Sequence, residues 1–143
     1  MIPEPPIEIK LSMNWLHENL GKTLFTQKIS DYRWSPYAIS QLIQDIYFQI
    51  PIPPIYLLYD KVNQIYQILK GDELIKSIVS FINSRTTTSG MHLMEDLNGL
   101  NYSQLCRQDN YFKKHFEEYS ITAYIYEKST VTNNILSLIE TRR

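Results

Sequence analysis

The stretch from Ile39 to Glu73, ISQLIQDIYFQIPIPPIYLLYDKVNQIYQILKGDE, decides how this chain folds. Its first part spaces apolar residues three and four positions apart, which predicts an amphipathic helix. A Pro-Ile-Pro-Pro step at 51–54 ends that helix and holds the backbone extended. Two short strands at 55–59 and 65–69 then follow around a turn, and Gly71 supplies a tight corner into a second helix. The buried positions of the first helix are predicted to be Ile39, Leu42, Ile43, Ile46, Tyr47 and Ile50.

On the N-terminal side, the chain shows one strand and two helix starts. Apolar residues alternate with charged ones from Ile7 to Leu11, which predicts a short strand. Ser12 is placed to cap a helix that runs through Leu20. The pair Ser35-Pro36 predicts the start of the amphipathic helix, because proline at the first helical position has no amide that needs a partner.

On the C-terminal side, the tract Ser84–Gly90 is predicted to be a flexible loop. A helix at 110–118 and a strand around 121–126 follow, and Thr130 is predicted to cap a last helix whose buried face includes Leu138. Strands and helices that mix in this order indicate the α+β class, with a small mixed sheet packed by helices.

The composition indicates one folded domain spanning residues 1–143, since domains cluster near ~100–150 residues. No apolar run approaches the ~18 residues of a membrane span, so we expect a soluble cytoplasmic protein with no membrane partner. The lone Cys106 excludes an internal disulfide. A net charge of −1 disfavours a free-standing DNA binder, because basic charge supplies most of the affinity for a phosphate backbone.

The chain resembles the N-terminal domain of GmrSD-type restriction enzymes, within the wider ParB/sulfiredoxin-like fold. The match is carried by Tyr32-Arg33-Trp34-Ser35, by Leu42-Ile43, by Pro51-Ile52-Pro53-Pro54 and by Gly71. It covers roughly residues 11–143. The resemblance implies a ParB-like α+β fold and a role in DNA processing or anti-phage defence.

The positions that the family uses for chemistry depart from its pattern. Its Gln-Arg pair falls on Ile29-Ser30, its Asp-Gly-Gln-Gln-Arg motif on Lys70-Gly71-Asp72-Glu73-Leu74, and its last-helix Arg and Asn on Glu140 and Arg142. In the family these residues are thought to hold and hydrolyse a nucleoside triphosphate. Lys70 replaces an anionic group that would coordinate a metal or orient water, and Leu74 replaces a guanidinium that would clamp phosphate. We therefore expect family-type hydrolysis to be lost.

Several residues remain candidates for a site at this corner. Asp72 and Glu73 are the candidate catalytic acids, although two carboxylates at a helix start are also favoured by the helix dipole alone. Lys70, Gly71 and Arg33 are the candidate phosphate-binding residues. Beside Arg33, the resemblance places Tyr32, Trp34 and Ser30 in the cleft. The sequence predicts no metal site, and a residual nucleotide with Mg²⁺ is the one cofactor it leaves open.

Two surface features point to macromolecular partners. Lys113 and Lys114 beside aromatic residues, together with Arg142 and Arg143, are candidate nucleic-acid contacts, although a solvated helix face is the simpler interpretation. Tyrosine is abundant on the predicted strands, which favours a protein-binding sheet face. The tyrosines concerned are Tyr56, Tyr59, Tyr66, Tyr124 and Tyr126.

Three functions follow from the sequence. The first is a non-catalytic relative of the GmrSD-type domain that acts by binding in a DNA-processing or defence system. The second is a residual nucleotide-dependent nuclease or NTPase subunit that uses Lys70, Asp72, Glu73 and Arg33 in altered roles. The third is a protein-interaction module that keeps only the scaffold. Because the chain stops at Arg143, directly after the last family helix, we expect a partner chain or a further C-terminal domain to supply any nuclease chemistry.

Overall fold

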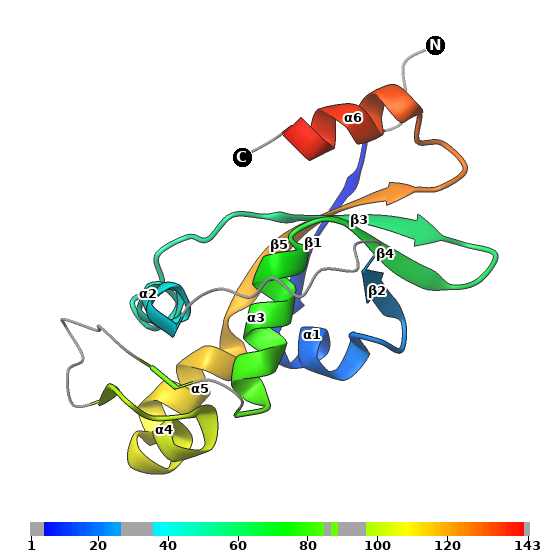
Figure 1. Cartoon of the computed structure of the whole chain (residues 1–143). Helices are drawn as coiled ribbons and strands as arrows, with labels where there is room; N and C mark the ends of the chain where they lie inside the picture. Colours follow the sequence, from blue (N-terminus) through cyan, green and yellow to red (C-terminus); the bar gives the residue numbers. More distant parts are fainter. Residues whose placement is uncertain (1–4, 27–35, 85–86, 89–96, 142–143) are drawn as a thin grey trace.

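A computed structural model describes residues 5–26, 36–84, 87–88 and 97–141 of the chain (Figure 1). Its described part is α+β, as the sequence predicts, with a mixed sheet in the strand order β1-β5-β3-β4-β2. The strands are β1 (Ile7–Ser12), β2 (Leu24–Thr26), β3 (Ile55–Asp60), β4 (Ile65–Lys70) and β5 (Ser120–Glu127). The helices are α1 (Met13–Asn19), α2 (Pro36–Tyr47), α3 (Asp72–Ile82), α4 (Tyr102–Gln108), α5 (Asn110–Glu118) and α6 (Asn133–Thr141).

The sheet is built around a central antiparallel hairpin of β3 and β4. Strand β5 pairs parallel with β3 and antiparallel with β1, and the short β2 pairs parallel with β4. Figure 1 shows α6 on one side of the sheet and α1, α3, α4 and α5 on the other. The sheet therefore lies between a thick helical layer and a single helix.

The core lies between the sheet and the thick helical layer. Strand residues such as Ile55, Leu57 and Ala123 have no exposed surface, and Ile75 on α3 is buried equally. Three phenylalanines from α3 and α5 stack at the lower end of this core, with ring centroids of Phe81 and Phe116 5.9 Å apart. No helix in the described ranges has the length and apolar character that a membrane span needs.

Of the six positions predicted for the buried stripe of α2, four are buried, Tyr47 is half-buried against the core, and the last is exposed. Ile39, Leu42, Ile43 and Ile46 are buried, but Ile50 is 50% exposed. The helix ends at Tyr47, and the chain then turns through Gln49 with a φ of +59°. Helical spacing no longer applies beyond that turn, so Ile50 points away from the core.

The start of the last helix also differs from the prediction. The hydroxyl of Thr132, not of Thr130, accepts a hydrogen bond from the amide of Ile135 in the first turn of α6. Thr130 instead donates to the carbonyl of Glu127 and closes the preceding turn. The helix thus starts later than predicted, and its Leu138 is 63% exposed rather than buried.

Of the predicted loop at 84–90, the structure describes only Ser84, Thr87 and Thr88. Thr88 is 2% exposed. Its hydroxyl donates to the carbonyl of Leu97 and accepts from the amide of Leu100. These bonds tie the segment after α3 to the turn that precedes α4.

Candidate functional site

The corner between β4 and α3 is built by glycine. Gly71 is the N-cap residue of α3 and has a φ of +114°, a backbone conformation that L side chains rarely adopt. A Cβ built on it would lie 2.6 Å from Cγ2 of Ile55, at the start of β3. The close approach lets the helix begin directly above the strand that follows the proline step. Gly71 therefore fixes the corner for two independent reasons, its φ and its packing.

The two candidate acids after Gly71 have different surroundings. Glu73 is exposed, whereas Asp72 is only 8% exposed. The Oδ1 atom of Asp72 is buried and has no hydrogen-bond partner among the residues that the structure describes. Both carboxylates lie in the first turn of α3, where the helix dipole favours negative charge. The two acids therefore do not form a matched pair around one solvent-filled site.

The residues on either side of the acids also bear on phosphate binding. Leu74 is 6% exposed and belongs to the hydrophobic core, so the position where the sequence comparison expected an arginine holds a packed leucine. Lys70 is half-buried and pairs with Tyr56 in the hairpin ladder. Among the residues that the structure describes, Lys70 has no ion pair. Positions 70–74 of the corner thus offer one ammonium and no guanidinium.

Six of the predicted site residues lie outside the described residues. These are Ser30, Tyr32, Arg33, Trp34, Arg142 and Arg143. The predicted cleft beside Arg33 therefore has no described geometry. In the ranges that are described, no group of three His, Cys, Asp or Glu side chains gathers closely enough to hold a metal ion.

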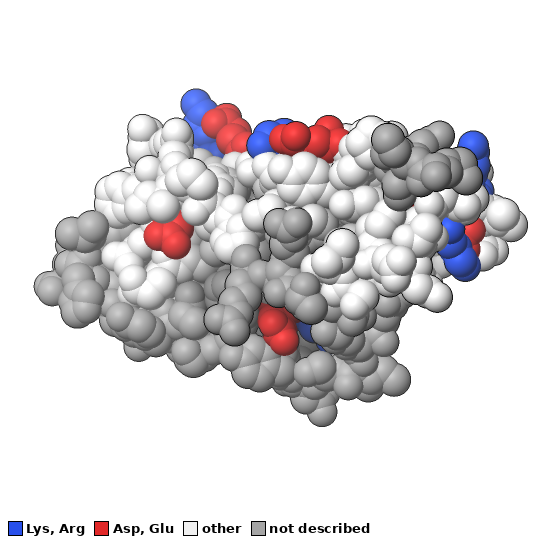
Figure 2. Space-filling model, turned by 90° about the horizontal axis from the view of Figure 1, so that it is seen from above, with Lys and Arg blue, Asp and Glu red and all other residues white. Residues whose placement is uncertain are grey.

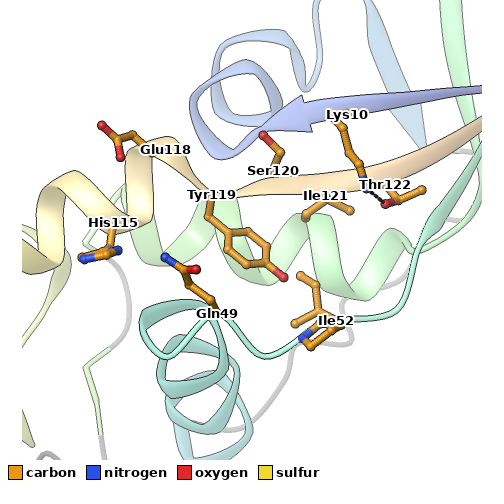
Figure 3. Close-up of a pocket in the computed structure, with 10 residues that line it drawn as sticks. Lys10, Gln49, Ile52, His115, Glu118, Tyr119, Ser120, Ile121 and Thr122 are labelled. Atoms are coloured by element: carbon orange, nitrogen blue, oxygen red, sulfur yellow. Dashed lines mark hydrogen bonds between the residues drawn. The ribbon is translucent and has the colours of Figure 1, made fainter.

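The structure brings together a groove that sequence reasoning missed. It has a volume of about 420 Å³ and lies between the proline step, the end of α5 and the first residues of β5 (Figure 3). Ile52 and Ile121 supply apolar surface, and polar groups come from the other lining residues. Those are Lys10, Gln49, His115, Glu118, Tyr119, Ser120 and Thr122. Figure 3 shows Lys10 bonded to the Thr122 hydroxyl at one end of this groove.

Tyr119 crosses the groove and connects its two walls. Its hydroxyl donates to the carbonyl of Ile50 at 3.4 Å, which links the end of α5 to the proline step. Burial raises the pKa of Tyr119 above its ordinary value, and the carboxylate of Asp45 adds to that shift. Tyr119 is therefore a neutral hydrogen-bonding group at physiological pH.

An exposed aromatic patch adjoins the groove. We define it as Tyr47, Phe48, Tyr111 and His115, which come from the end of α2 and from α5. Phe48 is 48% exposed and Tyr111 is 60% exposed. Tyr111 meets His115 edge to face at 4.2 Å between ring centroids. The groove and the patch together form an exposed surface with both apolar and polar groups, the composition common at protein interfaces.

The predicted basic cluster on α5 is only partly available to nucleic acid. Lys114 is exposed, but Lys113 lies 4.0 Å from Glu117 in an ion pair one helical turn away. Phe112, which the sequence placed beside these lysines, is 1% exposed and packs in the core. On the face seen from above, which Figure 2 shows, the blue Lys and Arg side chains lie beside red Asp and Glu side chains rather than forming a broad basic area.

The tyrosines predicted to share one sheet face lie on two. Tyr56 is opposite Tyr124 in the ladder, with ring centroids 5.5 Å apart, and Tyr126 follows two residues later on the same face. Tyr59 and Tyr66 pair on the opposite face, 4.8 Å apart. A single five-tyrosine binding face therefore does not exist.

Only one sequence signal pointed to the groove, which was the Pro-Ile-Pro-Pro step that forms its wall. The residues of the groove come from three segments far apart in the chain, around positions 10, 49–52 and 115–122, and no spacing along the sequence relates them. No family model, curated protein or solved structure matches this chain.

Proposed function

We propose that this chain is a binding module that keeps the scaffold of a GmrSD-type N-terminal domain without its triphosphate chemistry. It works in the cytoplasm, within a DNA-processing or anti-phage defence system, and its partner is another protein. The observation that carries the proposal is the corner itself. Gly71 still packs against Ile55, while the matching arginine position holds a core leucine, Leu74.

The chemistry of the corner supports binding over hydrolysis. Hydrolysis of a triphosphate needs groups that neutralise the charge developing on the phosphoryl oxygens, and removing one such group typically costs ~10²–10³ in rate. Lys70 is a point charge that cannot replace a planar guanidinium held in two-point contact. A cation at the family's acidic position also repels the divalent metal that such reactions use.

The exposed surface supports a protein partner rather than DNA alone. The aromatic patch, with Ile50 at 50% exposure beside it, offers apolar area of the kind that protein interfaces bury. The net charge of −1 and the ion-paired Lys113 give little of the phosphate-neutralising charge that a DNA complex needs.

The first experiment measures the melting temperature with ATP, GTP and CTP, each with and without Mg²⁺. A ligand at 100 times its dissociation constant stabilises a fold by ~2.7 kcal/mol, so binding at the corner would be visible. We expect no shift with any nucleotide. A shift that requires Mg²⁺ and is lost in Lys70→Ala would overturn the proposal in favour of the residual enzyme.

The residual enzyme is favoured by one observation, the buried Oδ1 of Asp72 without a partner. Buried polar atoms are usually satisfied, so an unpaired carboxylate oxygen marks a place where a ligand donor or a cation could bind. Asp72→Asn tests this directly. If the corner binds a magnesium nucleotide, Asp72→Asn abolishes the melting shift, whereas Glu73→Gln at the exposed neighbour leaves it unchanged.

The second experiment separates a protein partner from DNA. Duplex binding is measured between 50 and 200 mM salt, and the protein is separately used as bait for its partner. We expect weak, non-specific duplex binding and a protein partner that is lost in the patch variant Phe48→Ser/Tyr111→Ser. The control Val62→Ser removes an apolar residue at the far hairpin that is more exposed than either patch residue, and it should retain the partner.

A further inference from the structure

Strand β1 forms one edge of the sheet. It pairs with β5 along one side, from Ile7 opposite Ile125 to Ser12 opposite Ser120. Its other side pairs with no described strand, because the strand order begins at β1. Such an edge presents a row of backbone donors and acceptors that can pair with another chain (Figure 1).

The side chains of β1 alternate between the two faces of the sheet. Ile9 and Leu11 face the core, where Leu11 is 7% exposed, while Ile7 at the start of the strand is 66% exposed. Glu8 and Lys10 lie on the opposite face. On each side of Ile9 the strand has a charged residue and then an apolar residue. The charged residue is Glu8 on the N-terminal side and Lys10 on the C-terminal side, so the two charges are opposite in sign.

We propose that two copies of this chain pair antiparallel along β1, about a two-fold axis through Ile9. This register places Glu8 of each copy opposite Lys10 of the other. It also places Ile7 of each copy opposite Leu11 of the other and brings the two Ile9 side chains together. The result is one continuous sheet across the dimer, with both thick helical layers on the same side.

The register follows from charge and face together. A shift that moves the pairing by one residue turns the apolar faces of the two copies to opposite sides of the sheet, and Ile9 then lies opposite Glu8 or Lys10 with no charge pair formed. Centring the pairing on Glu8 places two Glu8 carboxylates opposite each other, and centring it on Lys10 does the same for two ammonium groups. Like charges directly opposite are destabilising. Only the Ile9 register joins opposite charges on both sides of the axis.

Two unsatisfied features of the single chain support the second copy as the occupant. Glu8 is exposed and has no ion pair among the described residues, so its carboxylate is available. Ile7 is exposed although Ile9 and Leu11 on the same face pack in the core, and the pairing covers it with Leu11 of the other copy. Pro5 and Pro6 precede the strand and have no amide donors, which limits the new ladder to residues 7–11.

The charges on the edge do not repel a second copy in this register. Charged side chains on an edge strand commonly discourage pairing with another chain. Here the two charges of β1 have opposite signs and are spaced symmetrically about Ile9. An edge of this pattern attracts itself in one orientation. This inference does not depend on the proposed function of the corner.

The test uses charge reversal and sedimentation velocity of the full chain over a wide concentration range. Wild type is expected to dimerise. Glu8→Lys places an ammonium group opposite Lys10 twice per dimer, and Lys10→Glu places a carboxylate opposite Glu8 in the same way. Each cross-strand charge pair contributes ~0.2–1 kcal/mol to pairing. Each reversal changes two such pairs per dimer from attraction to repulsion, so we expect the dissociation constant to rise roughly tenfold or more.

Two further samples make the test specific to this register. The double variant Glu8→Lys/Lys10→Glu restores opposite charges and should recover the wild-type dissociation constant. An equimolar mixture of Glu8→Lys with Lys10→Glu should form a heterodimer, although each variant alone is weakened. A monomeric wild type would overturn the proposal. A dimer that neither single reversal weakens would overturn it as well, since another surface would then hold the copies together.

Discussion

Gly71 and Ile55 approach so closely that a Cβ on the glycine would lie 2.6 Å from Cγ2 of Ile55. This contact joins the start of α3 to the first residue of β3, directly after the proline step. It fixes where the helix begins relative to the central hairpin. The stability of the fold and the geometry of the candidate corner therefore depend on the same glycine.

The first prediction concerns that glycine. Gly71→Ala should lower the free energy of unfolding by about 2–4 kcal/mol, because it adds left-handed backbone strain and overpacking against Ile55. Gly21→Ala is the matched control, since Gly21 also has a positive φ of +86° but has nothing within 4 Å of the position that a Cβ would take. The control should cost about 1 kcal/mol. Urea denaturation measures both, and equal losses would show that the contact with Ile55 is unimportant.

The second prediction concerns Asp60 at the end of β3. Hydrogen bonds from the side chain and backbone of Asn63, and the ammonium of Lys128 at 3.4 Å, hold the pKa of this carboxyl below its ordinary value of 3.8. A carboxyl with a lowered pKa stabilises the fold above pH 3.8, and that contribution is lost as pH falls through the lower folded value. Asp60→Asn should therefore be less stable than wild type at pH 7.

The difference between Asp60→Asn and wild type should narrow as pH falls below about 3.8. Urea denaturation at several pH values between 7 and 2.5 measures it. Asn63→Ala provides a second check, because it removes the side-chain donor, the largest cause of the lowered pKa, and should move the acid transition of the Asp60 contribution upward. A difference that stays constant down to pH 2.5 would mean that Asp60 is held by packing and not by its charge.

The third prediction compares two buried hydroxyls. The Oγ of Ser80 on α3 is buried without a hydrogen-bond partner, so Ser80→Ala removes a desolvated polar group and improves helix propensity. It should leave the free energy of unfolding unchanged or raise it by about 1 kcal/mol. Thr88 makes hydrogen bonds to both Leu97 and Leu100, so Thr88→Val should lower it by about 1–3 kcal/mol. Equal destabilisation by the two substitutions would show that Ser80 has a bonded partner in solution.

Much of the fold could be predicted from local sequence patterns. Alternation found β1 and β5, the three-and-four spacing found α2 and α3, and α5 has the predicted bounds of 110 and 118. These elements were predictable because apolar residues recur along each of them with a single period, that of a helix or that of a strand. The strand order was not predictable, since β1 and β5 lie at opposite ends of the chain and pair through contacts that no local pattern records.

The candidate site was less predictable than the fold. The glycine corner was found because Gly71 is required by local backbone geometry. The groove was missed because Lys10, Gln49 and Tyr119 come from three segments that meet only after folding. The exposure of Ile50 and Leu138 was also missed. Ile50 lies beyond the end of the regular helix α2, where helical spacing no longer applies. Leu138 lies on a helix face that the sheet does not cover.

Release of inorganic phosphate from ATP, GTP and CTP, with Mg²⁺ and with or without duplex DNA, tests the central claim most directly. If the proposed likeness to a GmrSD-type domain holds, a corner with Lys70 and a buried Leu74 should release phosphate no faster than buffer alone. The contrary result is steady turnover above the buffer rate that disappears in both Lys70→Ala and Asp72→Asn. That outcome would make the corner an active site and contradict a function based on binding alone.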